Sequence, residues 1–265
     1  MLDTGSGSEK GVYGCHSFPA LDDDRKESTV WNFHDHKISV TPEGENAKPG
    51  NYLFRYKRYL NNKIVVEKLL TSISNSVTIC ILPATPLYSI QDLSRHLCLR
   101  FKSAIILDQH QKLNFYVKMP IEIGIFKQSN KKGILLIDCI SLCKQQYTLY
   151  GTPERGLICR YKETEIYTAE TNTVKFEEAL INMQIHNNTD KIIQINTLVI
   201  PLHDVIVDHR NDNAYLSGKT EIRVGSSFGK DIVNVQLLNA KLRDPKLSPI
   251  ESREDTLTFL MDSGF

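Results

Sequence analysis

The sequence predicts an all-β protein with two consecutive β-sandwich-like domains and a short C-terminal helix. Apolar and polar residues alternate with a period of two over several short segments, as in strands with one face in a core and one in water. Turn-forming clusters separate these segments at short intervals, and helix signals are few. Short strands with frequent turns are typical of sandwiches and barrels, so we expect an immunoglobulin-like architecture.

Composition and charge narrow the class of protein. The chain has 265 residues, enough for one large domain or two ordinary ones, and hydrophobic residues make up 41% of it. These values exclude a wholly disordered or collagen-like chain. The formal net charge is only +1, so no long-range field draws the protein toward nucleic acid or anionic lipid. The sequence thus carries no strong nucleic-acid signal, and any site for a charged partner must be local.

Segment hydrophobicity and cysteine usage predict a cytoplasmic protein. No run of roughly 18 apolar residues is present, as a transmembrane segment would need, and the N-terminus lacks a signal-peptide pattern. The six cysteines are spread along a chain too large to need disulfides for stability. We expect all six thiols to be reduced.

The strand pattern starts near Trp31, after a polar segment at residues 1–27 that we expect to be a disordered tail. In the clearest strand, Leu113, Phe115 and Val117 alternate with polar residues and are expected to face the core. The same pattern recurs at residues 97–102, 181–186 and 233–238.

Polar clusters divide the ordered part of the chain. Turn-forming residues gather at positions 61–62, 128–133, 187–190 and 211–213. The cluster at 128–133 is the best domain boundary, because it leaves two pieces of sandwich size. We therefore expect one domain over residues 28–128 and another over 133–247, with a single continuous sandwich as the alternative.

A helix is expected only at residues 248–265. Ser248 can cap its N-terminus, Pro249 suits the first helical position, and Gly264 can end it. The favoured interpretation is a helix packed on the second sandwich; the alternative is a docking or oligomerisation element.

His34 and His36 are the candidate metal ligands. Two residues at positions i and i+2 of a strand point the same way, about 7 Å apart, and can share a metal ion. No spacing identifies a third ligand, so an exposed strand start is the favoured interpretation and no cofactor is expected.

Other chemically suggestive patterns favour structural roles. Cys139, Cys143 and Cys159 lack zinc-site spacing and lie among apolar residues, as buried thiols do. Residues 54–59 interleave cationic and aromatic side chains, but each face of that strand is mixed, which also suits an ordinary strand. The common nucleotide, hydrolase and zinc-protease motifs are absent from the sequence, which disfavours an enzyme.

Residues 150–161, YGTPERGLICRY, combine a turn with unexplained charges. Glycines at both ends of residues 151–156 and a proline near the start predict a hairpin loop. Glu154, Arg155 and Arg160 are not required by that turn. They predict either a structural hydrogen-bond network or an anion or ligand site that includes the loop amides.

After this loop, strand alternation assigns the side chains to two faces. Leu157, Cys159 and Tyr161 are expected to form the core face, and Arg160 lies on the opposite one.

Two motifs resemble a known family. The segment Tyr147-Thr148-Leu149-Tyr150-Gly151-x-Pro153-x-x-Gly156-x-Ile158-Cys159-Arg160-Tyr161 and the earlier Met119-Pro120-Ile121-Glu122-Ile123-Gly124-Ile125 are similar to an archaeal family, domain of unknown function 432. The resemblance covers roughly residues 30–245. It implies a mainly β fold and an archaeal cytoplasmic setting, without established activity or catalytic residues. Because similar domains are joined to small mechanosensitive-channel modules, it also implies a possible membrane-protein partner.

Together these observations predict a noncatalytic module that binds a protein partner or self-associates, since sandwiches expose edge strands that a partner can extend. The alternative is a metal- or anion-dependent enzyme or small-ligand protein, with a site near His34 and His36 or near Arg155 and Arg160.

Overall fold

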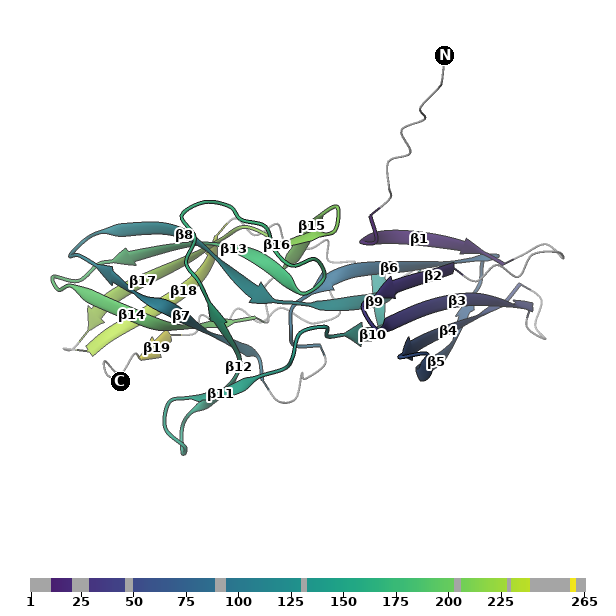
Figure 1. The fold of residues 1–265 in the computed structure, drawn as a ribbon, viewed down its shortest axis with the longest axis horizontal. Coiled ribbons are helices and arrows are strands. Elements are labelled where there is room, and N and C mark those ends of the chain that lie inside the picture. The colour runs from purple at the N-terminus through teal and green to yellow at the C-terminus, as the bar shows by residue number, and fades with distance from the viewer. Residues whose placement is uncertain are drawn as a thin grey trace, which may run out of the picture.

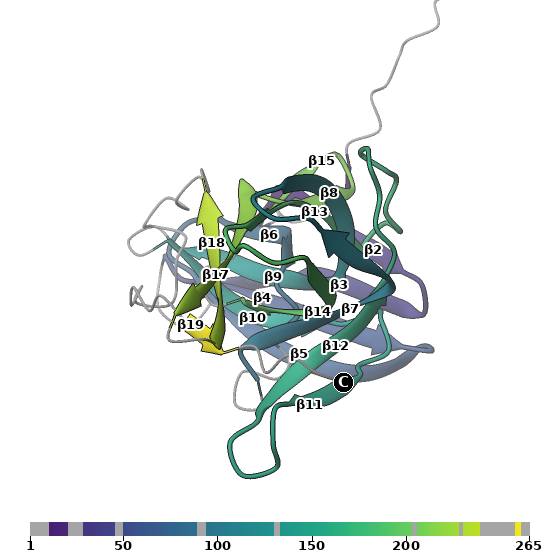
Figure 2. The same cartoon turned by 90° about the vertical axis from the view of Figure 1, so that its left-hand side faces the viewer.

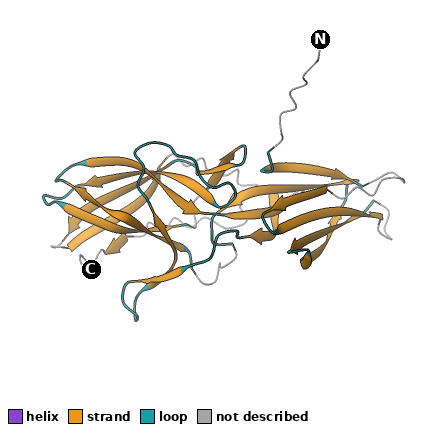
Figure 3. Cartoon of the chain, in the orientation of Figure 1, coloured by secondary structure: helices purple, strands orange, loops and turns teal. Residues whose placement is uncertain are grey.

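The computed structural model shows an elongated molecule with a pair of β-sheets at each end (Figure 1). It describes residues 11–20, 29–45, 50–88, 94–129, 133–202, 206–227, 230–238 and 258–260. Among these residues the secondary structure is strand without helix, as Figure 3 shows. The prediction of an all-β protein is therefore confirmed.

The first pair of sheets has four strands in each sheet, and every pairing is antiparallel. One sheet has the order β1 (Gly14–Pro19), β6 (Ser76–Ala84), β9 (Glu122–Ser129) and β10 (Gly133–Ile140). The other has the order β2 (Thr29–Phe33), β3 (His36–Glu45), β4 (Tyr52–Leu60) and β5 (Lys63–Ser72). Apolar side chains from both sheets share one core, which includes Ile38, Phe54, Tyr56, Ile79 and Ile125.

The second pair of sheets is larger and includes parallel pairings. One sheet has the order β11 (Tyr147–Tyr150), β12 (Leu157–Thr164), β7 (His96–Leu107) and β14 (Ile193–Pro201). The other has the order β15 (Val207–Arg210), β16 (Asn213–Leu216), β13 (Glu178–Asn187), β17 (Lys219–Ser227), β18 (Lys230–Leu238) and β19 (Thr258–Leu260), and β8 (Lys112–Pro120) also pairs with β13.

The larger core follows the alternation that the sequence shows. Phe115, Val117 and Met119 of β8 are buried, and so are Ile181 and Met183 of β13. These two strands pair directly, with Ile181 opposite Val117 and Met183 opposite Phe115. Because cross-strand partners lie on the same face, both strands contribute to one apolar layer.

The chain passes between the two sheet pairs after β6, after β8 and after β10. Between β8 and β9 only Ile121 intervenes. The polar segment 128–133, which the sequence assigns to a domain boundary, instead joins β9 to β10 as neighbours in one sheet. Turn-forming residues have the same local chemistry in a hairpin and in a linker, so composition alone does not distinguish the two.

Two terminal segments differ from the expectation. Residues 14–19, assigned to a tail, form β1 on the edge of a sheet, and Cys15 forms a disulfide with Cys80 of β6. The expectation that all thiols are reduced is thus wrong for this pair, whose members are 65 residues apart in sequence. Most of the predicted helix at 248–265 lies outside the described residues, and its three described residues form β19, paired with β18. Within the described part of the chain, no helix is long and apolar enough to cross a membrane.

The predicted turn at residues 187–190 is confirmed and is held together by a buried amide. The side-chain Nδ2 of Asn187 donates to the carbonyls of Leu107, Asp108 and Lys191, at 3.2, 2.9 and 2.7 Å. Its Oδ1 accepts from the N–H and the hydroxyl of Thr189, at 3.0 and 2.7 Å. Asn187 therefore joins the end of β7 to the turn between β13 and β14.

We predict that Asn187→Ala lowers the free energy of unfolding by about 2–4 kcal/mol, because several buried backbone groups lose their partner. Urea unfolding measures the change. The neighbouring Asn188 is exposed, so Asn188→Ala is the control and is expected to stay within about 0.5 kcal/mol of the native protein. Equal effects of the two substitutions would contradict the assigned role of Asn187.

Candidate functional site

The hairpin predicted at residues 151–156 is present and connects β11 to β12. Gly151 has a φ of 102°, a conformation that favours glycine. The N–H groups of Arg155 and Gly156 donate to the carbonyl of Thr152, at 3.2 and 2.6 Å. A side chain at Gly156 would place its Cβ 2.6 Å from that same oxygen. The two glycines are thus required by the turn itself.

The structure separates the charged residues of this hairpin. Glu154 and Arg155 are exposed in the loop, which extends away from the body of the molecule in Figure 2. Arg160 lies further along β12, where only 1% of its surface is accessible. Its strand neighbours are Tyr147 of β11 and Leu97 of β7. Arg155 and Arg160 therefore do not form a common site with the loop amides.

Both faces of β12 are buried at this point. Cys159 has no accessible surface and packs with Cys98 and Val199, so its predicted burial is confirmed. Arg160, on the opposite face, shares the side of Leu97, which belongs to the larger core. The alternation of residues along a strand predicts which side chains lie on the same face. It does not show that other parts of the chain cover the polar face.

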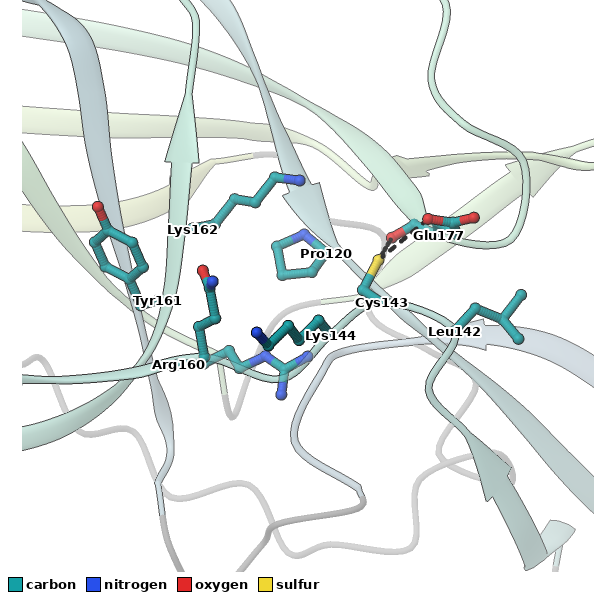
Figure 4. Close-up of a pocket in the computed structure, with 9 residues that line it drawn as sticks. Pro120, Leu142, Cys143, Lys144, Arg160, Tyr161, Lys162 and Glu177 are labelled. Carbon is teal, nitrogen blue, oxygen red and sulfur yellow. Dashed lines mark hydrogen bonds between the residues drawn. The ribbon is translucent and has the colours of Figure 1, made fainter.

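A cavity of about 280 Å³ lies beside Arg160 (Figure 4). Its walls come from the end of β8, the segment between β10 and β11, strand β12 and the residue before β13. It is lined by Pro120, Leu142, Cys143, Lys144, Gln146, Arg160, Tyr161, Lys162 and Glu177. The cavity thus lies where the chain crosses between the two sheet pairs.

Among the residues that the structure describes, Arg160 finds no hydrogen-bond partner. All three guanidinium nitrogens are buried and unpaired, and the guanidinium carbon lies 5.7 Å from the centre of the Tyr147 ring. A cation–π contact of this kind does not satisfy the N–H donors. An unpaired buried charge costs several kcal/mol, so it calls for an ion or water that completes its hydrogen bonds.

The remaining charges of the cavity are mixed. Lys144 and Lys162 add positive charge beside Arg160, whereas Glu177 adds a carboxylate. Part of the charge is balanced internally, because Lys162 pairs with Glu178 at 3.0 Å and Glu177 pairs with the ring of His34 at 3.1 Å. The wall around Arg160 keeps a cationic character.

Cys143 contributes a neutral thiol to the wall. Its Sγ–H donates to the main-chain carbonyl of Glu177 at 3.2 Å. Burial, with a further contribution from the Glu177 carboxylate, raises the pKa of Cys143 to about 11. The thiolate is the nucleophilic form, so Cys143 is a poor nucleophile near neutral pH.

The candidate metal ligands lie in a turn rather than on one strand face. His34 follows β2 with a φ of 52°, and His36 begins β3. His36 lies 3.5 Å from the guanidinium of Arg58, and burial lowers its pKa. Among the described residues, no group of three or more histidine, cysteine, aspartate or glutamate side chains is arranged to hold a metal ion.

A second arginine, partly buried, provides a comparison that the sequence did not reveal. Arg58 of β4 donates to Asp138 of β10 through Nε at 2.7 Å, and the hydroxyl of Tyr56 donates to the same carboxylate at 2.7 Å. Next to Asp138, Cys139 donates to the fully buried Glu122 at 3.1 Å. In this cluster Arg58 is paired with a carboxylate, whereas no carboxylate of the described residues forms a hydrogen bond or ion pair with Arg160.

Strand pairing also accounts for the interleaved cationic and aromatic side chains of residues 54–59. The rings of Phe54 and Tyr56 are fully buried in the smaller core, so they are not available to stack on bases. Arg55, on the other face, pairs with Glu43 and Glu67. The interleaved cationic and aromatic side chains therefore have structural roles: the rings pack in the core, and Arg55 forms ion pairs on the other face of the sheet.

A comparison with known families gives one match. The model of a family described as a protein of unknown function (DUF432) matches residues 12–262. The chain belongs to the DUF432 family. The match confirms the resemblance, and it extends beyond residues 30–245 to include β1 of this DUF432 chain. No curated protein and no solved structure matches the chain.

The two motifs that suggested the family meet at the cavity. Pro120 comes from the first motif, and Arg160 and Tyr161 come from the second. Three of the nine residues that line the cavity thus come from the parts of the DUF432 chain that carry the resemblance.

We predict slow alkylation of Cys143 at pH 8, because the raised pKa leaves the thiol protonated. Its rate with iodoacetamide should be about a hundredfold below that of a free cysteine and should rise about tenfold per pH unit toward pH 11. Peptide mapping by mass spectrometry measures the rate, and Cys143→Ser identifies the peptide. Alkylation at pH 8 as fast as that of free cysteine would show that the thiol is not shielded in this way.

Proposed function

We propose that this protein is a noncatalytic binding protein that captures a small anion, a carboxylate or a phosphate, in the cavity beside Arg160. One observation carries the proposal: Arg160 lines the cavity, and its three guanidinium nitrogens are buried without a hydrogen-bond partner among the described residues. A bound anion would supply the missing acceptors. Burial strengthens the attraction, because less water screens the two charges.

The chemistry of the wall matches this ligand class. The planar guanidinium can donate two parallel hydrogen bonds to a carboxylate or a phosphate. Lys144 and Lys162 lie on the same wall and can add attraction for the anion. A cavity of about 280 Å³ is at the small end of the range for ligand pockets, which favours a compact solute.

The titratable groups of the wall support binding rather than catalysis. Cys143 is held as a neutral thiol, and the Glu177 carboxylate is engaged by His34. A nucleophilic enzyme needs an activated nucleophile with a base in reach. The Glu177 carboxylate lies 3.8 Å from the Cys143 Sγ, but the pKa of this thiol is raised to about 11, so the pair supplies little thiolate near neutral pH. A protein partner, a membrane-protein partner and a cytoplasmic location stay predictions from the sequence.

We predict that Arg160→Met weakens anion binding at least tenfold, because the charged hydrogen bonds to the ligand are lost. Isothermal titration calorimetry with inorganic phosphate and, separately, with malonate measures the affinity and distinguishes the two anion classes. The matched control is Arg155→Met, which makes the same chemical change on an exposed side chain and should leave the affinity within twofold.

Thermal unfolding without added anion checks that the variants fold. Methionine fills much of the space of the arginine without its charge, so Arg160→Met is expected to keep or raise the unfolding temperature. The proposal fails if the native protein binds neither anion. It also fails if Arg160→Met binds the anion as tightly as the native protein and the Arg155→Met control do.

A further inference from the structure

The segment before β1 connects the two sheet pairs. The N–H of Val12 donates to the carboxylate of Asp212, which lies in the turn between β15 and β16, at 2.7 Å. The ring of Tyr13 is buried and packs on Phe176 and His209, with ring centroids 5.1 and 5.3 Å apart. Residues just before a strand of the first sheet pair are thus anchored on the second pair.

Strand β1 is fixed to its own sheet by one neighbour and one covalent bond. It lies at the end of the strand order and pairs along its whole length with β6, from Gly14 opposite Ile81 to Pro19 opposite Ser76. The disulfide between Cys15 and Cys80 joins the two strands only two residues from Tyr13. An edge strand with one partner opens more readily than a central one, so the disulfide adds a constraint where β1 is weakest.

Aromatic packing continues from Tyr13 to the cavity. Phe176 packs against Tyr13 and also against Phe33 of β2, with ring centroids 5.3 Å apart in the second contact. The next residue is Glu177, which lines the cavity and accepts hydrogen bonds from Cys143 and from the N–H of Ile121. The position of this wall therefore depends on a ring that β1 holds in place.

We propose that the Cys15–Cys80 disulfide is a redox-responsive link that holds the Glu177 wall of the anion cavity in position, an inference that rests on the proposed function. A dithiol reductant would transfer two electrons and two protons to the disulfide, giving two cysteine thiols and the oxidised cyclic reductant. Without the covalent bond β1 opens more often and Tyr13 leaves Phe176. Water then enters beside Glu177 and weakens the attraction between Arg160 and its anion.

Phosphate affinity of the full chain tests the link. Reduction with dithiothreitol should raise the Kd for inorganic phosphate by about 2- to 30-fold, the usual range of coupling through packed side chains. The double variant Cys15→Ser/Cys80→Ser should bind like the reduced protein and should not respond to the reductant. Cys98→Ser, which removes a free thiol outside the cavity, is the control and should keep the redox response. Equal affinity of the oxidised and reduced native protein would overturn the inference.

The variant Tyr13→Ala tests whether the disulfide acts on the cavity through the packing of Tyr13 on Phe176. This variant keeps both cysteines but removes the ring that supports Phe176, so it should bind phosphate weakly in both redox states. A redox response of native size in Tyr13→Ala would show that the disulfide acts by another route and would overturn the proposed path.

Hydrogen exchange gives a readout that does not need the anion. The N–H groups of Glu177 and Glu178 donate to the carbonyl of Val174, at 3.2 and 3.0 Å. Their exchange should become faster on reduction in the native protein and stay unchanged in Tyr13→Ala. Faster exchange without phosphate binding in either state would refute the anion site but support the redox link, whereas unchanged exchange on reduction would refute the link.

Discussion

The connection between β8 and β9 constrains the rest of the molecule. Ile121 is the only residue between these strands, which belong to different sheet pairs, and its N–H donates to the carbonyl of Glu177 at 2.9 Å. So short a connection keeps the ends of the two sheet pairs together. Arg160 lies in the middle of β12, and the segments that cross between the sheet pairs line the cavity together with it. Its burial therefore depends on how distant segments are brought together as well as on its own strand.

The partly buried Arg58 and the buried Arg160 differ in how their charges are balanced. Arg58 lies between two sheets of one pair and has the carboxylate of Asp138 as its partner. Arg160 lies at the junction between the pairs and has a cavity where a partner would be. A fold gains nothing from an unpaired buried cation, since an apolar residue of the same size would cost less. We propose that a ligand from outside the chain supplies the partner that Arg160 lacks among the described residues.

The sequence predicted the features that depend on local patterns. Strand alternation correctly identified the buried face of β8, and the glycines of residues 151–156 correctly identified the hairpin. Both depend on neighbours within a few positions, where backbone geometry leaves few choices. The strand at residues 14–19 could not be found in this way, because its partner β6 begins only at Ser76.

The candidate site was predictable only in part. The sequence singled out Arg160, but it grouped this residue with the exposed Arg155 because the two are close along the chain. Its true neighbours, among them Pro120 and Glu177, come from segments that the topology brings together. His34 and His36 were paired on the assumption of a strand, and the positive φ of His34 was not visible in the sequence.

A crystal structure of the protein grown with arsenate would test the anion site most directly, because arsenic gives an anomalous signal that identifies the bound ion. We expect an anomalous peak in the cavity, with arsenate oxygens about 2.7–3.0 Å from the guanidinium nitrogens of Arg160. A cavity without the ion, with the Arg160 guanidinium paired to a carboxylate of the protein itself, would contradict this expectation.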